Sequence, residues 1–126
     1  MQSAVCAALG LAPSLALADL CATGAVQDFL PAHPPETCGI ARAEDGTLED
    51  HCAWRFDAGS REAEQRFADL GNALSACAAA APADQRVNHP DSYDLLVFKT
   101  EKGRISLSLK EKYALQARYI FIRKTR

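Results

Sequence analysis

The sequence predicts an α+β fold in which one amphipathic helix packs on a four- to five-stranded antiparallel sheet, in the order ββαβββ. Three observations predict it. Apolar residues recur with helical spacing after Ser60, apolar and polar residues alternate near the C-terminus, and the cysteines suit a disulfide-stapled domain. With 126 residues, 48% of them hydrophobic and 24% charged, the chain has the length and composition of one globular domain.

The first eighteen residues carry no charge and predict a cleaved export signal. Their apolar run is interrupted by Gly10 and Pro13 and ends in a small-x-small pattern at residues 16–18. The mature domain is therefore expected to be residues 19–126. The start of the segment lacks the basic residue usual in such signals, so an uncleaved apolar helix, buried or membrane-anchoring, is the alternative.

The cysteine count agrees with export. Cys6 lies inside the predicted signal, and an even number of cysteines is left for the mature domain. In a short exported chain, such a set predicts a disulfide framework. The alternative is a cytosolic protein with buried thiols. The four cysteines of the framework are Cys21, Cys38, Cys52 and Cys77.

Chain geometry favours one pairing of these cysteines. Cys52 lies eight residues before Ser60, which is roughly 26 Å in an extended strand. Cys77 lies seventeen residues after Ser60, which is also roughly 26 Å along a helix. A helix that folds back on the preceding strand brings Cys52 beside Cys77. The remaining disulfide is then Cys21–Cys38.

The region before the helix predicts an irregular segment and then a β-hairpin. Residues 19–37 contain three prolines and are expected to be irregular, with apolar side chains that cover part of the core. In residues 38–56, Asp45-Gly46 suits a two-residue turn. That turn sets Arg42 opposite Glu49 and directs the two cysteines of the hairpin to opposite faces.

Residues 60–79 predict the main helix. Ser60 suits the N-cap position, and Glu62 and Glu64 complement the helix dipole in the first turn. Pro82 is expected to end the helix. A single apolar stripe faces the core. It consists of Ala63, Phe67, Leu70, Leu74 and Cys77.

Three strands are expected after the helix, at residues 93–99, 104–110 and 115–124. The first two flank a short turn that ends in Gly103. The second alternates strictly between apolar and polar residues, which is typical of a half-buried strand. The third is apolar on both faces at residues 119–122.

The sequence contains no catalytic signature. His89, Asp91 and Ser92 are the residue types of a hydrolytic triad, but sequence neighbours rarely meet in triad geometry, and turn chemistry explains them more simply. The histidines have no partner at the spacing of a zinc site. We therefore predict no catalytic residue, metal or cofactor, with a small hydrolase at this loop as an alternative.

Charge is strongly separated along the chain. Residues 19–94 contain five arginines and fourteen acids, whereas residues 95–126 contain nine basic residues and two acids. Three interpretations compete. The basic sheet balances the acidic remainder of the domain, or it binds an anionic partner, or it binds nucleic acid, which export disfavours.

A binding surface follows if Leu107, Leu109, Tyr119 and Phe121 face the helix. The opposite sheet face then mixes cations with isoleucines, which is typical of a binding patch. It lacks the aromatic stacking set of a sheet that binds single-stranded RNA. The alternative is that residues 26–30 cover this face as a second layer. The predicted surface residues are Arg104, Ser106, Ser108, Lys110, Gln116, Arg118, Ile120 and Ile122.

The sequence thus predicts a small periplasmic or secreted, non-catalytic binding module. Its partner is an anionic ligand or a protein, held on the basic sheet face, and nucleic acid is not expected. No membrane span is expected after signal cleavage. Two alternatives are kept, which are the small hydrolase and a purely structural or inhibitory protein.

Overall fold

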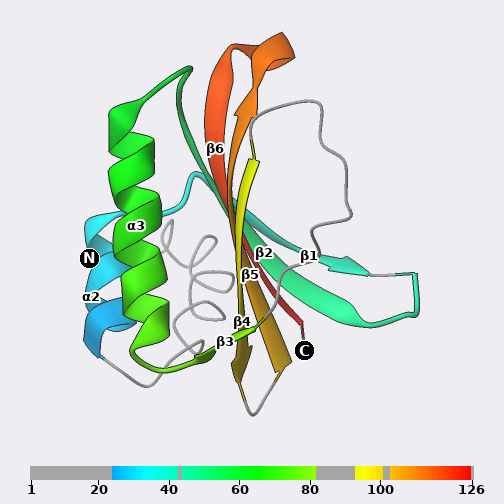
Figure 1. The fold of residues 1–126 in the computed structure, drawn as a ribbon. Coiled ribbons are helices and arrows are strands. Elements are labelled where there is room, and N and C mark those ends of the chain that lie inside the picture. The colour runs from blue at the N-terminus through cyan, green and yellow to red at the C-terminus, as the bar shows by residue number, and fades with distance from the viewer. Residues whose placement is uncertain (1–23, 43, 82–92, 101–102, 126) are drawn as a thin grey trace, which may run out of the picture.

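The computed structural model describes residues 24–42, 44–81, 93–100 and 103–125. Figure 1 shows how the helices and strands of these residues are arranged. In chain order the elements are α2 (Gly24–Ala32), β1 (Thr37–Arg42), β2 (Leu48–Asp57), α3 (Arg61–Ser75), β3 (Ala79–Ala81), β4 (Tyr93–Thr100), β5 (Gly103–Lys112), the short 3-10 helix η1 (Tyr113–Leu115) and β6 (Ala117–Thr125). The predicted signal segment and Cys21 lie outside the described residues.

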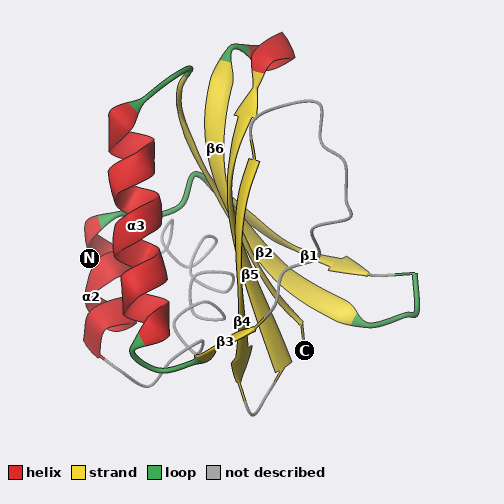
Figure 2. Cartoon of the chain, viewed as in Figure 1, coloured by secondary structure: helices red, strands yellow, loops and turns green. Residues whose placement is uncertain are grey.

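The strands form one antiparallel sheet, and the α-helices α2 and α3 lie on the same side of it (Figure 2). The strand order is β1-β2-β6-β5-β4-β3, so that β6 lies between β2 and β5. The α+β prediction with one main helix on an antiparallel sheet is confirmed. The sheet has six strands, one more than the upper limit of the prediction.

The main helix α3 begins where the sequence predicts and ends earlier. The Ser60 hydroxyl oxygen accepts a hydrogen bond from the Ala63 backbone N–H at 3.2 Å, which caps the first turn. Leu70 and Leu74 are fully buried against the sheet. The helix ends at Ser75, and the alanines at 79–81 pair with β4 as the short strand β3. Sheet pairing overrides the helical propensity of these alanines.

Residues 24–32 form helix α2, so the prediction of an irregular segment is wrong. Val26, Phe29 and Leu30 share one helix face and are buried in the same core as α3. Phe29 meets the ring of Trp54 edge-on at 6.2 Å, and the Trp54 indole N–H donates to the His33 carbonyl at 2.8 Å. The alternative in which residues 26–30 cover the opposite sheet face is therefore wrong.

The β1–β2 hairpin differs from the prediction by one position of register. Arg42 lies opposite Leu48 rather than Glu49, because a longer connection replaces the two-residue turn. A one-residue shift moves every side chain of a strand to the other face. Cys38 therefore lies directly opposite Cys52, and the two form a disulfide with Cα atoms 4.0 Å apart.

This disulfide overturns the predicted pairing. The predicted bonds Cys52–Cys77 and Cys21–Cys38 each use a cysteine that the structure joins to another partner. Cys77 is also a disulfide cysteine, and its partner lies outside the described residues. The pairing argument failed because it relied on a hairpin register that held Cys38 away from Cys52.

Candidate functional site

The register of the central strands assigns each side chain to one of two sheet faces. Leu107 lies opposite Ile122, and Leu109 lies opposite Ile120. All four are buried under the helices, with Ile120 and Ile122 only 1% and 0% exposed. The prediction that these isoleucines face outward is wrong. Because residues 119–122 are all apolar, alternation alone did not indicate which face of β6 is buried.

Arg118 also lies on the helix side, which corrects its predicted place on the partner-binding face. Its Nε atom donates to Glu111 at 2.8 Å, and its Nη1 atom donates to Glu64 at 2.9 Å and to the Ser60 carbonyl at 3.0 Å. The Gly59 N–H donates to the same Glu111 oxygen at 3.1 Å. Arg118 therefore ties the start of α3 to the sheet.

The electrostatics of this tie agree with its geometry. Burial lowers the pKa of the Arg118 guanidinium, but hydrogen bonds and charge attraction from Glu111 and Glu64 outweigh burial. The pKa is therefore raised above its ordinary value. Glu111 and Glu64 therefore compensate the positive charge of Arg118 within the fold.

The other predicted residues of the surface keep their outward orientation on β5. We call the sheet face turned away from α2 and α3 the outer face. Arg104 is exposed there, Ser106 and Lys110 are half-buried, and Ser108 is 8% exposed. Gln116 is exposed in the connection before β6, with a left-handed backbone conformation at φ 51°.

Sequence reasoning missed two aromatic residues of the outer face. Tyr119 and Phe121 alternate with the buried isoleucines, so their half-buried rings lie on the outer face. The rings are stacked, with centroids 5.3 Å apart and planes 11° apart. The apolar run at residues 119–122 was the available signal, but the wrong face was assigned to it.

Two cations lie against these rings. The guanidinium carbon of Arg55 lies 5.8 Å from the centre of the Tyr119 ring. The Lys112 ammonium lies 5.8 Å from the same centre and 5.5 Å from that of Phe121. Such contacts with the ring faces attract a cation and leave its charge uncompensated.

The outer-face cations fall into two clusters. Cluster 1 lies around Tyr119 and consists of Arg55, Lys110 and Lys112. Cluster 2 lies toward the opposite end of β6 and consists of Lys99, Arg104 and Arg123. Arg55 and Lys110 lie on either side of Tyr119. Lys99 lies opposite Arg104, and Arg123 lies opposite Ser106, the next outward residue of β5 after Arg104. Tyr119 and Arg123 are four residues apart on β6, which separates the clusters by roughly 13 Å.

The outer face also carries carboxylates on β2, and Asp57 shares the row of Ala117 with Lys112. Glu36 and Asp57 line the same surface hollow as Arg55, and Glu49 lies across from Thr125 at the end of the β2–β6 pair. Within the described residues, no carboxylate lies at ion-pair distance from Arg55 or Lys112. Arg55 and Lys112 therefore contact aromatic rings and no carboxylate among the described residues.

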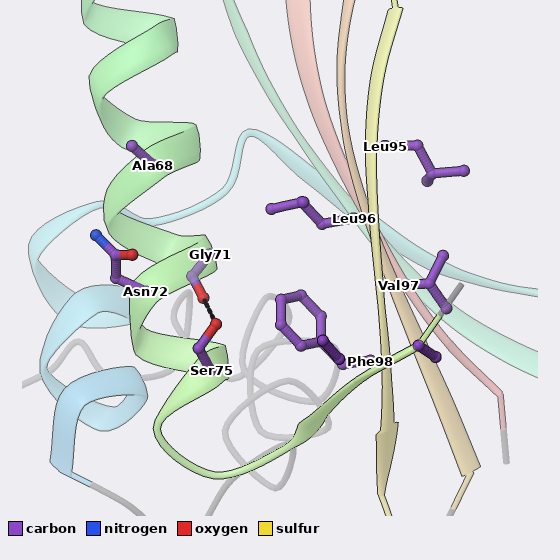
Figure 3. A pocket seen from close by; sticks show the side chains of 10 residues that line it. Ala68, Gly71, Asn72, Ser75, Leu95, Leu96, Val97 and Phe98 are labelled. Atoms are coloured by element: carbon purple, nitrogen blue, oxygen red, sulfur yellow. Dashed lines mark hydrogen bonds between the residues drawn. The ribbon is translucent and has the colours of Figure 1, made fainter. Parts of the chain in front are cut away.

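A second hollow lies on the helix side, between α3, β3 and β4 (Figure 3). Its volume is about 490 Å³. Leu96 and Phe98 point into it, and the Ser75 hydroxyl donates to the Gly71 carbonyl at 2.9 Å. A Cβ atom at Gly71 would lie 3.0 Å from Leu96, so glycine allows this close approach. The lining contains no ionisable side chain.

The remaining candidate chemistry has no described site. His89, Asp91 and Ser92, the alternative hydrolase residues, lie outside the described residues. In the part of the chain that is described, no three His, Cys, Asp or Glu side chains are grouped to hold a metal ion. None of the described helices has the length and apolar character needed to cross a bilayer. Comparison with protein-family models, curated proteins and solved structures finds no match to the chain.

Proposed function

We propose that the protein is a small exported, non-catalytic binding module that takes an anionic partner on the outer face of its sheet. One observation carries the proposal. Arg55 and Lys112 are held against the Tyr119 and Phe121 rings instead of against carboxylates. Their positions are fixed while their charges and N–H donors stay available to a ligand.

The surroundings of these cations support binding. An aromatic contact that holds a long side chain reduces the rotamer freedom lost when a ligand arrives. Exposed arginine and aromatic side chains are also the residue types enriched in protein interfaces. The hydroxyl of Ser106, half-buried opposite Arg123, adds a hydrogen-bonding group to the same face.

Export is the second part of the proposal. The Cys38–Cys52 disulfide supports it, because disulfides persist in oxidising compartments such as the periplasm and the extracellular space. The uncharged apolar segment ahead of residue 19 and its small-x-small pattern supply the signal. A periplasmic or secreted location follows from these two features together.

The test of binding uses immobilised heparin as a generic polyanion and compares two charge reversals. Lys112→Glu removes a cation of cluster 1, and Arg61→Glu makes the same charge change at an exposed position at the start of α3. We expect Lys112→Glu to elute at clearly lower salt than the wild type, because each lost contact reduces salt-dependent binding. Arg61→Glu should elute close to the wild type.

Equal shifts for the two variants would contradict the proposal, since they would report only net charge. Thermal unfolding of both variants controls for folding. Glutamate suits the first turn of a helix, so Arg61→Glu is expected to fold normally.

A further inference from the structure

We infer that the partner is a protein that binds through an extended acidic segment lying along β6, with carboxylates over both cationic clusters. The inference rests on the proposed function and names the class of its ligand. It starts from the spacing of the clusters. A single small anion cannot contact Arg55 and Arg123 together, because about 13 Å of β6 separates their rows. A chain with repeated negative charges spans both.

An extended peptide fits this spacing. Side chains at positions i, i+2 and i+4 of a strand-like peptide point to the same side and rise about 6.6 Å per step. Acidic residues at i and i+4 therefore reach cluster 1 and cluster 2 at the same time. Carboxylates also suit the planar fork of arginine, which binds them in bidentate geometry.

The peptide residue at i+2 would lie over the row of Phe121, which is between the two clusters. Phe121 is flanked there by Ser108 on β5 and Ala53 on β2, which are both short side chains. The Phe121 ring is therefore larger than the side chains on either side of it and offers an apolar contact between the two clusters. We expect an apolar side chain at i+2 of the partner, giving the pattern acidic-x-apolar-x-acidic.

The ring geometry disfavours single-stranded nucleic acid. Proteins that bind such strands offer aromatic faces on which bases stack. Here the rings of Tyr119 and Phe121 stack on each other at 5.3 Å, and Arg55 and Lys112 lie over them. Little ring face is left for a base, whereas a peptide side chain needs only the ring edge.

The test measures fluorescence anisotropy with two labelled peptides of identical composition. One carries the spaced pattern Glu-x-Leu-x-Glu, with serine at the x positions. The other carries the two glutamates next to each other. We expect the spaced peptide to bind the wild type about tenfold more tightly. Lys112→Glu and Arg123→Glu should each remove this preference, because each leaves one cluster incomplete, whereas Arg61→Glu should keep it.

The outcomes separate this inference from the proposed function. Equal affinity for the two peptides, or tighter binding of an oligothymidylate than of the spaced peptide, overturns the acidic-segment inference. Retained heparin binding through Lys112 would then still support the proposed function. Failure of the wild type to bind heparin, the oligonucleotide and both peptides overturns both.

Discussion

The cations on the two faces of the sheet are held in different ways. On the helix side, Arg118 is surrounded by Glu111 and Glu64, and its side chain is 16% exposed. Arg66 on α3 likewise pairs with Glu62 at 3.4 Å. On the outer face, Arg55 and Lys112 lie over aromatic rings.

This difference separates cations that serve the fold from cations available to a partner. A carboxylate that holds a cation also neutralises it, so Arg118 contributes to stability and has little left for a ligand. An aromatic ring positions a cation and leaves its charge intact. The kind of support around a basic residue is thus more informative than the number of basic residues on a surface.

The largest expected effect on stability comes from removing Arg118, the cation that is paired with Glu111 and Glu64. Arg118→Met should lower the free energy of unfolding by about 3–5 kcal/mol, because it leaves the Glu111 carboxylate buried without its cation. Glu111 is only 5% exposed, and its Oε2 atom has no hydrogen-bond partner among the described residues. Urea unfolding monitored by circular dichroism measures the loss.

Arg66→Met is the matched control for that variant. Its ion pairs with Glu62 and Asp69 are partly exposed, and such pairs contribute less than about 1 kcal/mol. A loss for Arg118→Met no larger than that of the control would show that the tie to Glu111 is not structural.

The second prediction sharpens the assignment of the two faces. Ile122→Ala should lower the free energy of unfolding by about 3 kcal/mol, because it opens a cavity in the core. Phe121→Ala should cost roughly 1 kcal/mol, since its half-buried ring lies on the outer face and leaves no enclosed cavity. Urea unfolding of both variants is the measurement. A larger loss for Phe121→Ala would reverse the face assignment of β6.

The smallest expected effect on stability concerns the Asp45 carboxylate, which accepts hydrogen bonds from uncharged groups of Thr47. Hydrogen bonds from Thr47 lower the pKa of Asp45 below its ordinary value of 3.8. A group whose pKa is lower in the folded state stabilises the fold above its unfolded pKa, and this contribution is lost as the pH falls through the folded pKa. Asp45→Ala should therefore slightly lower the melting temperature at neutral pH and make no difference well below pH 3.8.

Asp45→Asn is the control for this pH dependence. Asparagine keeps an acceptor oxygen in the turn but does not titrate. Its melting temperature relative to the wild type should therefore vary with pH, while the gap between Asp45→Asn and Asp45→Ala should stay constant. A gap between Asp45→Ala and the wild type that persists in acid would contradict the role of the ionised carboxylate.

Local patterns predicted most of the fold. The cap at Ser60 and the helical stripe located α3. The turn at Gly103, the alternation that follows it and the apolar run at residues 119–122 located β4, β5 and β6 to within about two residues. These signals are local in the sequence. The errors involve relations between elements. The register of β1 against β2 depends on the connection at residues 43–47, and the strand β3 forms only because β4 lies beside it.

The candidate site was predictable only in part. The basic character of the sheet follows from the charge count after residue 95, and Arg104 and Lys110 were assigned to the correct face. The contacts of Arg55 and Lys112 with aromatic rings were not predictable. Residues 119–122 are all apolar, so the sequence does not indicate whether the aromatic rings or the isoleucines face the helices. The contact between Arg55 and Tyr119 also joins residues that are distant in sequence and become neighbours only in the folded sheet.

The central position of β6 has a consequence for biogenesis. The hairpin β1–β2 is made early, yet its inner neighbour β6 is synthesised only after α3, β3, β4 and β5. Pairing between strands so distant in sequence is slow, because a long loop must close before any contact forms. During translation the inner edge of β2 therefore has no strand partner until β6 is made. The sheet is therefore complete only after β6, the last described strand, has been made.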